Sequence, residues 1–272
     1  MRQKLGQHFL IDESILEQIL TTANIQQTDS VLEIGPGQGV LTKHLIQNAG
    51  EVIAVEFDRN LVDALQRTVG HLPNVHIVYG DARHLDYQAV LTEHLPSQQR
   101  VKVVANLPYY AATTIVLAFF QFPHVITSCT LMFQKEVAER ITASPGTKSY
   151  GSLSVICQYY SAARYCFTVP PSAFQPAPKV ESAVIHLEVY HRPPVFVQDE
   201  PFFLQMVKNI FLTRRKMLKN ALLKNMAGKC SLAHVQEAFT HLHLPETVRA
   251  EDLSVQELAE LSNVLISYQT AK

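Results

Sequence analysis

Short runs of consecutive apolar residues alternate with helical patterns along the first two thirds of the chain. We predict β-strands at Ser30–Ile34, Val52–Val55, Val75–Val78 and Val101–Ala105. These runs are continuously apolar, which is typical of parallel strands that are covered on both faces. Helical patterns lie between or after them, at Gly39–Asn48, Asn60–Val69 and Thr113–Phe122. The alternation predicts a doubly wound α/β sheet.

The pattern changes in the last third of the chain. Val125–Phe133 and Ser182–Val189 are two further predicted strands, with a Pro-rich passage at Val169–Lys179 between them. A boundary is expected at His191–Pro194, because only helical patterns follow it. Those patterns are Pro201–Leu212, Arg215–Lys224, Leu232–His241 and Ser254–Tyr268. We therefore predict two domains, residues 1–192 and 193–272, of which the second is small and all-helical.

Composition excludes several classes of protein. The chain has 272 residues, of which 47% are apolar and 17% charged. A chain of this size and composition can bury a large core, so it is neither a disordered tail nor a small disulfide-stapled scaffold. Its net charge of −1 excludes a uniformly basic polymer binder. The four cysteines form no CxxC pair and have no zinc-like spacing with histidines, so we expect reduced, buried thiols and no metal site.

The near-zero net charge hides a strongly basic segment. Residues 208–229 contain seven lysines and arginines and no acid, so the rest of the chain is acidic. A solvated helix face is the ordinary interpretation of a charge run. Seven bases without a single acid favour instead a surface that faces nucleic-acid phosphates. The candidate RNA-binding residues are Arg214, Arg215, Lys216 and Lys219.

A glycine-rich turn follows the first predicted strand and opens a helix. It reads Glu33-Ile34-Gly35-Pro36-Gly37-Gln38-Gly39. Glycines allow a sharp turn and a close approach of a ligand to the backbone. The third glycine comes one residue earlier than in the dinucleotide pattern G-x-G-x-x-G, and an acid precedes the first glycine by two residues. This spacing argues against a pyrophosphate-binding dehydrogenase turn, although a turn without any ligand is the alternative for the motif taken alone.

Two acids stand at the ends of the next two predicted strands. Glu56 ends the strand Val52–Val55, 21 residues after Gly35, where a carboxylate can accept the hydroxyls of a ribose. Asp81 follows the strand Val75–Val78, and with the amide of Ala82 it can bind the edge of an adenine. Either acid alone would be an ordinary solvated strand end. Together with the glycine turn they predict a nucleoside-type cofactor at the carboxyl edge of the sheet.

The segment Asn106-Leu107-Pro108-Tyr109 follows the strand Val101–Ala105. An exocyclic adenine amine is a poor nucleophile, because its lone pair is delocalised into the ring. The Asn106 amide oxygen and the Leu107 carbonyl can each accept one N–H of such an amine and so orient its lone pair. Pro108 fixes the backbone, and Tyr109 offers a face for base stacking. An ordinary loop exit from the strand is the alternative when the segment is considered alone.

These features occur in order with three further motifs, at Gln3–Leu10, Phe174–Ala183 and Phe211–Leu218. The set resembles the ribosomal RNA adenine N6-dimethyltransferase family, and within it the bacterial KsgA (RsmA) branch. The resemblance covers nearly the whole chain. It implies a Rossmann-like S-adenosylmethionine-dependent methyltransferase sheet with a small C-terminal all-helical domain, and S-adenosylhomocysteine as the product of the cofactor.

The resemblance also implies which residues form the site. The expected cofactor-binding residues are His8, Leu10, Gly35, Gly37, Glu56, Asp81, Ala82 and Asn106. The expected catalytic and target-base residues are Asn106, Leu107, Pro108, Tyr109 and Phe174, with Phe174 closing over a flipped adenine opposite Tyr109.

The implied substrate is a pair of adjacent adenosines in a hairpin loop near the 3′ end of small-subunit rRNA, each of which receives two methyl groups. The expected partners are this RNA and the small ribosomal subunit, with no membrane, and we expect a cytoplasmic monomer. Two alternatives stay open. One is an enzyme that acts on large-subunit RNA and confers antibiotic resistance, and the other is a ribosome-assembly checkpoint in which methylation is secondary.

Overall fold

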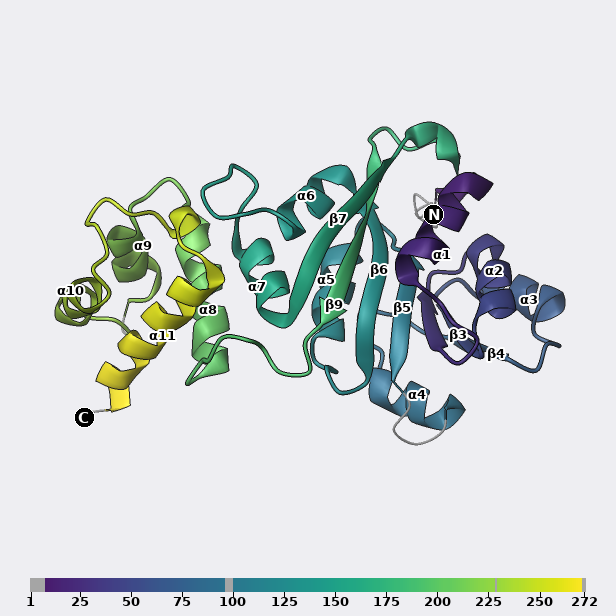
Figure 1. The fold of residues 1–272 in the computed structure, drawn as a ribbon, viewed down its shortest axis with the longest axis horizontal. Helices are drawn as coiled ribbons and strands as arrows, with labels where there is room; N and C mark the ends of the chain where they lie inside the picture. The colour runs from purple at the N-terminus through teal and green to yellow at the C-terminus, as the bar shows by residue number, and fades with distance from the viewer. Residues whose placement is uncertain (1–7, 96–99, 228, 271–272) are drawn as a thin grey trace. The chain divides into compact units, whose positions relative to one another are not determined.

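The computed structural model describes residues 8–95, 100–227 and 229–270. Within them, seven strands form one mixed sheet in the order β4-β3-β2-β5-β6-β9-β7, drawn in Figure 1. Its strands are β2 (Ser30–Ile34), β3 (Glu51–Glu56), β4 (Val75–Tyr79), β5 (Val101–Asn106), β6 (Ile126–Gln134), β7 (Ser161–Val169) and β9 (Ser182–Val189). Two short strands, β1 (Phe9–Leu10) and β8 (Phe174–Gln175), form a separate antiparallel pair.

The strand order makes a switch point beside β2. The chain runs outward from β2 to β3 and β4, then returns to place β5 and β6 on the other side of β2, and all these neighbours are parallel. Every residue of β2 is buried, which is the environment that its unbroken apolar pattern predicts. The doubly wound sheet is therefore confirmed. Strand β9 runs antiparallel to β6, with Ser182 opposite Gln134.

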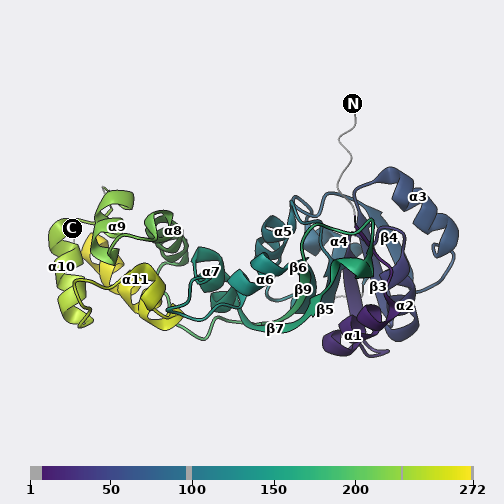
Figure 2. The same cartoon turned by 90° about the horizontal axis from the view of Figure 1, so that it is seen from above.

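Helices cover both faces of this sheet. The helices of this part are α1 (Glu13–Ala23), α2 (Val40–Asn48), α3 (Arg59–Thr68), α4 (Tyr87–His94) and α5 (Ala112–Phe119), and α6 (Lys135–Ile141) follows β6 where the chain leaves this part. In Figure 2, α1 and α2 lie on one side of the strands, and α4 and α5 lie on the other. The buried Tyr87 ring of α4 packs edge-on against Phe119 of α5, with 5.3 Å between ring centroids. Asp12 caps α1 by accepting from the backbone of Ser14 and Ile15.

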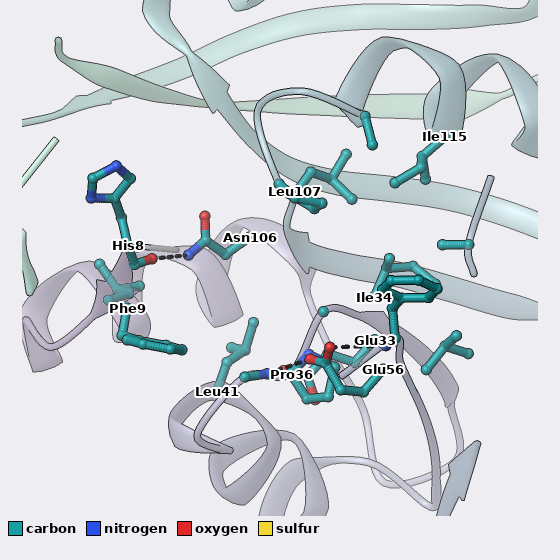
Figure 3. A pocket seen from close by; sticks show the side chains of 18 of the residues that line it. His8, Phe9, Glu33, Ile34, Pro36, Leu41, Glu56, Asn106, Leu107 and Ile115 are labelled. Carbon is teal, nitrogen blue, oxygen red and sulfur yellow. Dashed lines mark hydrogen bonds between the residues drawn. The ribbon is translucent and has the colours of Figure 1, made fainter. Parts of the chain in front are cut away.

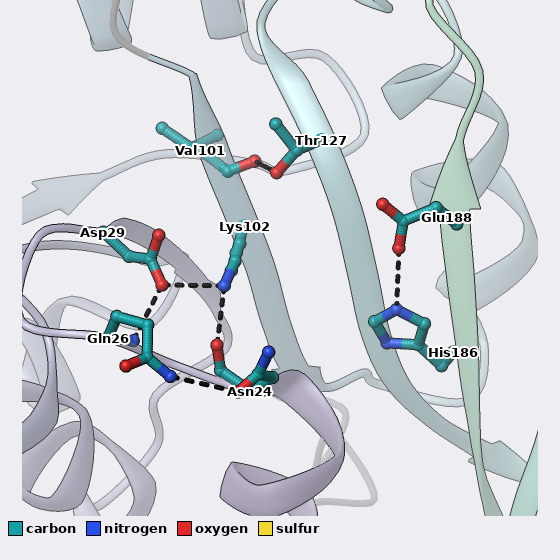
Figure 4. A network of polar contacts seen from close by, with 8 residues as sticks. All are labelled: Asn24, Gln26, Asp29, Val101, Lys102, Thr127, His186 and Glu188. Carbon is teal, nitrogen blue, oxygen red and sulfur yellow. Dashed lines mark hydrogen bonds and ion pairs between the residues drawn. The ribbon is translucent and has the colours of Figure 1, made fainter.

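The amino-terminal edge of the sheet is held by polar contacts, shown in Figure 4. Lys102 Nζ of β5 lies 2.7 Å from Asp29 Oδ2, just before β2, and 2.6 Å from the carbonyl oxygen of Asn24 after α1. This lysine ties α1 and two central strands together at the edge opposite to their carboxyl ends.

A second compact unit holds the remaining helices. It contains residues 139–161 and 192–272, whereas the first unit contains residues 1–138 and 162–191. The helices of the second unit are α7 (Ser152–Tyr160), α8 (Glu200–Ile210), α9 (Leu218–Asn225), α10 (Leu232–His241) and α11 (Val255–Thr270). The 3₁₀ turns η2 (Phe211–Thr213) and η3 (Ala250–Asp252) also lie in this unit, whereas η1 (Pro171–Ala173) lies in the first unit.

Helix α7 joins the C-terminal helices because it packs against α8 and α11. The hydroxyls of Tyr159 and Tyr160, at its end, both donate to the Glu200 carboxylate of α8, at 3.1 and 2.7 Å. The chain crosses from the first unit to the second between His191 and Arg192, one residue before the predicted division between residues 192 and 193. As a division of function it stays a prediction, and the structure adds residues 139–161 to the helical part.

The predicted strands match the observed ones to within one or two residues, whereas helices α4, α6 and α7 and strands β1, β7 and β8 were not predicted. Strand β7 is the last strand of the sheet and is largely half-buried, so its apolar pattern is weak. Three of the four cysteines are buried, and Cys166 is half-buried. Among the described residues, no helix has the length and apolar character needed to span a bilayer.

Candidate active site

A pocket opens at the carboxyl ends of the central strands of the first unit, shown in Figure 3. It is lined by residues that follow β2, β3, β4 and β5, and by the N-terminal residues His8, Phe9 and Leu10. These strands are neighbours in the order β4-β3-β2-β5. Their terminal side chains therefore form a row: Asp81 after β4, Glu56 at the end of β3, the glycine turn after β2, and Asn106 at the end of β5.

The glycine turn needs glycine for two separate reasons. Gly35, Gly37 and Gly39 all have positive φ angles, of 68°, 58° and 80°, which side chains rarely adopt. A Cβ atom on Gly37 would also lie 3.1 Å from the Phe9 ring, and one on Gly39 would lie 2.6 Å from Leu65. The turn thus brings bare backbone against the N-terminal segment and against α3, and it borders the pocket with main-chain atoms.

Glu56 is held by backbone N–H groups. The residue is 6% exposed. Its Oε2 atom accepts from Gly37 N at 3.2 Å, and its Oε1 atom accepts from Phe57 N at 2.8 Å and from Asp58 N at 2.9 Å. These bonds fix the orientation of the carboxylate at the pocket wall. A carboxylate in this position can accept the two hydroxyls of a ribose, as the sequence predicts.

Glu33, a second buried carboxyl, was not assigned a role from the sequence. It is 1% exposed, lines the pocket, and its Oε2 atom has no hydrogen-bond partner among the described residues. Burial, together with the nearby Glu56 charge, raises the pKa of Glu33 to about 8. The signal in the sequence that could have identified Glu33 is its position two residues before the first glycine of the turn. A buried carboxyl with one unpartnered oxygen suits a cationic ligand here, since a positive charge would favour its ionised form.

Asp81 carries a partner that the sequence did not predict. The Arg83 guanidinium donates to both oxygens of the Asp81 carboxylate, with Nε 2.9 Å from Oδ1 and the terminal nitrogen 2.5 Å from Oδ2. The Arg83 guanidinium holds the pKa of Asp81 well below its usual range. Ala82 is buried and lines the pocket. Its carbonyl oxygen accepts a hydrogen bond from the Tyr87 hydroxyl at 2.6 Å, which fixes the backbone at this position.

Asn106 lies at the junction of β5 and the pocket. Its Nδ2 atom is 3.4 Å from the carbonyl oxygen of His8, which leaves Oδ1 as the atom of the amide that can accept an N–H from a ligand (Figure 3). Leu107 is 1% exposed, and Leu107 and Pro108 both line the pocket. The Pro108 carbonyl accepts from Ala111 N at 2.9 Å, so the segment closes into a tight turn directly before α5.

Tyr109 is oriented by two neighbours. Its hydroxyl lies 2.5 Å from the hydroxyl of Ser182, a residue that is fully buried at the start of β9. Its ring is near the His8 ring, with 6.0 Å between centroids and 29° between planes. Burial raises the pKa of Tyr109, so the phenol stays neutral. Ser182 was part of a motif in the sequence, but nothing in the sequence indicated that it contacts a residue 73 positions away.

The N-terminal segment enters the site through β1. The Nδ1 atom of His8 is 2.7 Å from the carbonyl oxygen of Pro176, and Leu10 pairs with Phe174 across β1 and β8. Leu10 is buried and lines the pocket. Residues 3–7 of the N-terminal motif lie outside the described residues.

Phe174 is placed differently from the other predicted site residues. It is 3% exposed, belongs to the core that contains Leu10 and Val184, and is not among the residues that line the pocket. A role as a cover for a flipped base stays a prediction, and it requires the ring to leave this packing.

The four candidate RNA-binding residues lie in the second unit and divide into two pairs. Arg214 Nε is 2.5 Å from Glu251 Oε2, and Lys219 Nζ is 2.9 Å from Glu246 Oε2, so both are engaged in ion pairs. Arg215 and Lys216 are exposed. Lys216 also lines a shallow hollow with Asn220, Leu223 and Lys224. The structure therefore favours Arg215 and Lys216 as the basic groups available to a polyanion.

Within the described part of the chain, no cluster of three or more His, Cys, Asp or Glu side chains could hold a metal ion.

Comparison with known proteins gives consistent matches over the full length. Residues 1–267 match the family model described as "Ribosomal RNA adenine dimethylase". A protein of Alkaliphilus oremlandii named "Ribosomal RNA small subunit methyltransferase A" is 42% identical over 263 residues, which cover 97% of this chain and 91% of that protein. A protein of the same name from Oceanobacillus iheyensis is 40% identical over 273 residues, covering 99% and 92%.

Two solved structures share the fold. A dimethyladenosine transferase from Plasmodium falciparum superposes with a TM-score of 0.79 at 23% identity, covering 97% of this chain and 98% of that one. The 23S rRNA methyltransferase ErmE superposes with a TM-score of 0.72 at 24% identity, covering 95% and 99%. Both likenesses extend over the sheet and the C-terminal helices, so they confirm the predicted fold class.

Proposed function

The chain belongs to the ribosomal RNA adenine dimethylase family, and we propose that it transfers two methyl groups to N6 of each of two adjacent adenosines in 16S rRNA. The proposed methyl donor is S-adenosylmethionine, and S-adenosylhomocysteine is the product. The proposed target is a hairpin loop near the 3′ end of the small-subunit rRNA, within the small ribosomal subunit. The small-subunit specificity in the names of the bacterial relatives supports this choice.

The observation that carries the proposal is the row of groups at the carboxyl edge of the sheet. Because the strand order is β4-β3-β2-β5, the row runs from Asp81 through Glu56 and the glycine turn to Asn106. An elongated nucleoside bound along it places adenine at Asp81, ribose at Glu56 and the amino-acid part at the Gly35 turn. The reacting end then lies beside Asn106, where the acceptor base must enter.

The pocket residues fit S-adenosylmethionine. Glu56 is preorganised by three backbone N–H groups, and the positive-φ glycines expose main-chain atoms without side chains in the way. The Glu33 carboxyl, whose Oε2 atom has no hydrogen-bond partner among the described residues, suits the positive charges of the methionine part. When bound, this cofactor supplies an electrophilic methyl group on a sulfonium.

The target base is held by the segment that follows β5. Asn106 Oδ1 and the Leu107 carbonyl accept the two N–H bonds of the adenine amine, which turns the nitrogen lone pair toward the glycine turn. Tyr109, oriented by Ser182, provides the stacking face. The proton leaves the nitrogen after methyl transfer, so no general base of matched pKa is required. The rate gain comes from proximity and alignment, which contribute up to about 7–11 kcal/mol in favourable cases.

The second unit supplies RNA affinity in this proposal. Arg215 and Lys216 are exposed on a segment that carries no acid between residues 208 and 229. Such a surface binds phosphates without reading bases, so it holds the subunit while the pocket selects the adenosine. We propose that the protein works as a monomer in the cytoplasm, and that its reaction is a step of small-subunit biogenesis.

The test uses small and large ribosomal subunits from cells that lack the modification. The full-length chain is incubated with each subunit and with cofactor labelled in the methyl group, and the RNA is digested and analysed by mass. The proposal expects dimethylated adenosines in two adjacent positions of small-subunit RNA. Label in large-subunit RNA would support the resistance-type alternative, and no label in either would contradict a methyltransferase role. If the Asn106→Ala variant still supports normal maturation of the small subunit, the checkpoint role is separable from catalysis.

A further inference from the structure

Arg83 contacts two residues that line the pocket, Asp81 and Tyr110. Its side chain is 35% exposed, and its guanidinium contacts the carboxylate of Asp81, which follows β4 at one end of the row. Its Cζ atom also lies over the Tyr110 ring, 5.8 Å from the centroid. Tyr110 lines the pocket, directly follows Tyr109, and is 62% exposed. One side chain therefore contacts both the proposed adenine position of the cofactor and the proposed target loop.

The Asp81 carboxylate is already saturated by this arginine. Oδ1 accepts from Arg83 N at 3.0 Å and from Nε at 2.9 Å, while Oδ2 accepts from Nε at 3.2 Å and from the terminal nitrogen at 2.5 Å. His84 Nδ1 lies a further 3.5 Å from Oδ2. A carboxylate has about four lone-pair sites, so another donor must replace one of these contacts.

An adenine amine that binds Asp81 is such a donor. When the amine binds, it replaces the guanidinium as the donor to one oxygen of Asp81. A guanidinium has five N–H groups in a rigid fork and binds phosphate as well as carboxylate. The freed groups remain at the rim beside the exposed Tyr110 ring. A target adenosine that enters the pocket at Asn106–Tyr109 brings its own phosphates to this rim.

We propose that Arg83 exchanges partners during the reaction cycle: it pairs with Asp81 in the free protein, and it turns to an RNA phosphate beside Tyr110 once the cofactor's adenine occupies Asp81. This inference rests on the proposed function. In this account Arg83 acts on the cofactor through Asp81 and on the RNA by direct contact with a phosphate. The consequence is a linkage between the two sites, in which each ligand raises affinity for the other by the same factor.

The test measures this linkage directly. The dissociation constant of the full-length chain for unmethylated small subunits is measured with and without saturating S-adenosylhomocysteine, which carries the adenine but allows no turnover. The wild type is expected to bind the subunit about fivefold or more tightly with this ligand, within the usual range of such couplings. In Arg83→Leu the ratio is expected to fall to about one, since no guanidinium is available for release.

The matched control is Arg67→Leu, which removes the same charge from an exposed position in the last turn of α3. It should keep the wild-type ratio. If Arg83→Leu folds poorly, Arg83→Gln removes the charge while keeping N–H donors for Asp81, and the same loss of linkage is expected. A merely structural role of Arg83 would change both dissociation constants equally and leave their ratio intact.

Two outcomes would overturn the inference: a wild-type ratio near one, or an Arg83→Leu variant that keeps the wild-type ratio. Methyl transfer by the wild type is measured in the same preparations. Its absence would contradict the proposed function, whereas normal transfer without linkage through Arg83 would contradict only the exchange of partners.

Discussion

The pocket of the first unit and the basic segment of the second unit handle charge in opposite ways. In the pocket, Glu56 and Glu33 are almost completely buried, and Glu56 is fixed by three N–H groups at defined distances. In the basic segment, Arg215 and Lys216 are exposed, and their neighbours Arg214 and Lys219 are paired with acids. Buried, fixed groups select a ligand by geometry, whereas exposed cations attract any polyanion and are screened by salt. The comparison predicts different losses when each region is altered.

The largest expected effect comes from Glu56. Glu56→Ala removes the charge-assisted bonds to both ribose hydroxyls, each of which contributes about 1.5–3 kcal/mol, so cofactor affinity should fall by about 10²- to 10⁴-fold. Calorimetric titration with S-adenosylhomocysteine measures the loss, and the far-ultraviolet circular dichroism should stay that of the wild type. Unchanged affinity in a folded variant would remove Glu56 from the cofactor site.

The next largest effect is expected on RNA binding in the second unit. Arg215→Glu with Lys216→Glu should weaken binding to small subunits by about 10²-fold at low salt, and much less at high salt, because two phosphate contacts are lost. Cofactor affinity should not change. The control is Lys43→Glu with Arg67→Glu, which makes the same charge change at exposed positions of α2 and α3 in the first unit. Equal losses in both double variants would mean that only total charge matters.

A pH-dependent effect is expected from Glu33. Its pKa is raised from 4.5 to about 8 in the folded protein, so the stability that it contributes is full below pH 4.5 and is lost as the pH rises through about 8. Glu33→Gln has no such titration. Between pH 5.5 and 9 the free energy of unfolding of the wild type should fall relative to the variant by on the order of 3 kcal/mol. Urea unfolding at several pH values measures this, and a constant difference would show that Glu33 does not titrate in this range.

The smallest effect is expected at Ser182. Ser182→Ala leaves the Tyr109 hydroxyl without its partner, which should lower the free energy of unfolding by about 1–2 kcal/mol and raise the half-saturating subunit concentration a few fold. Tyr109→Phe should have a similar effect, and combining the two should add little. Ser128→Ala is the control, since Ser128 is also buried but lies near the amino-terminal end of β6. Additive effects of Ser182→Ala and Tyr109→Phe would show that their contact carries no energy.

Most of the pocket could be predicted because its residues stand at the ends of apolar strands. A run such as Val52–Val55 predicts both a parallel strand and the place of Glu56, and neighbouring parallel strands bring their ends to one edge. What could not be predicted depends on side-chain contacts between distant or unmarked positions. The Tyr109–Ser182 bond joins residues far apart in sequence, and Phe174 is buried because β8 pairs with β1.

The same limit applies to charges. The sequence shows four basic residues between Arg214 and Lys219, but not that two of them pair with Glu251 and Glu246, which come more than 25 residues later. Nor does Asp81-Ala82-Arg83 reveal whether the arginine folds back onto the acid or points to solvent. Ion-pair partners depend on the tertiary fold, so a charge count predicts the sign of a surface but not which groups are available on it.

The division of labour between the two regions is tested most directly by single-turnover methyl transfer at saturating cofactor, measured over a series of small-subunit concentrations. This one series gives both the maximal rate and the half-saturating concentration for each variant. Asn106→Ala should lower the maximal rate by about 10²- to 10³-fold with little change in half-saturation, because its amide bond to the target strengthens as the nitrogen becomes positive. Arg215→Glu with Lys216→Glu should raise the half-saturating concentration and leave the maximal rate nearly unchanged. A near wild-type maximal rate in Asn106→Ala, or a loss of the same parameter in both variants, would contradict the account.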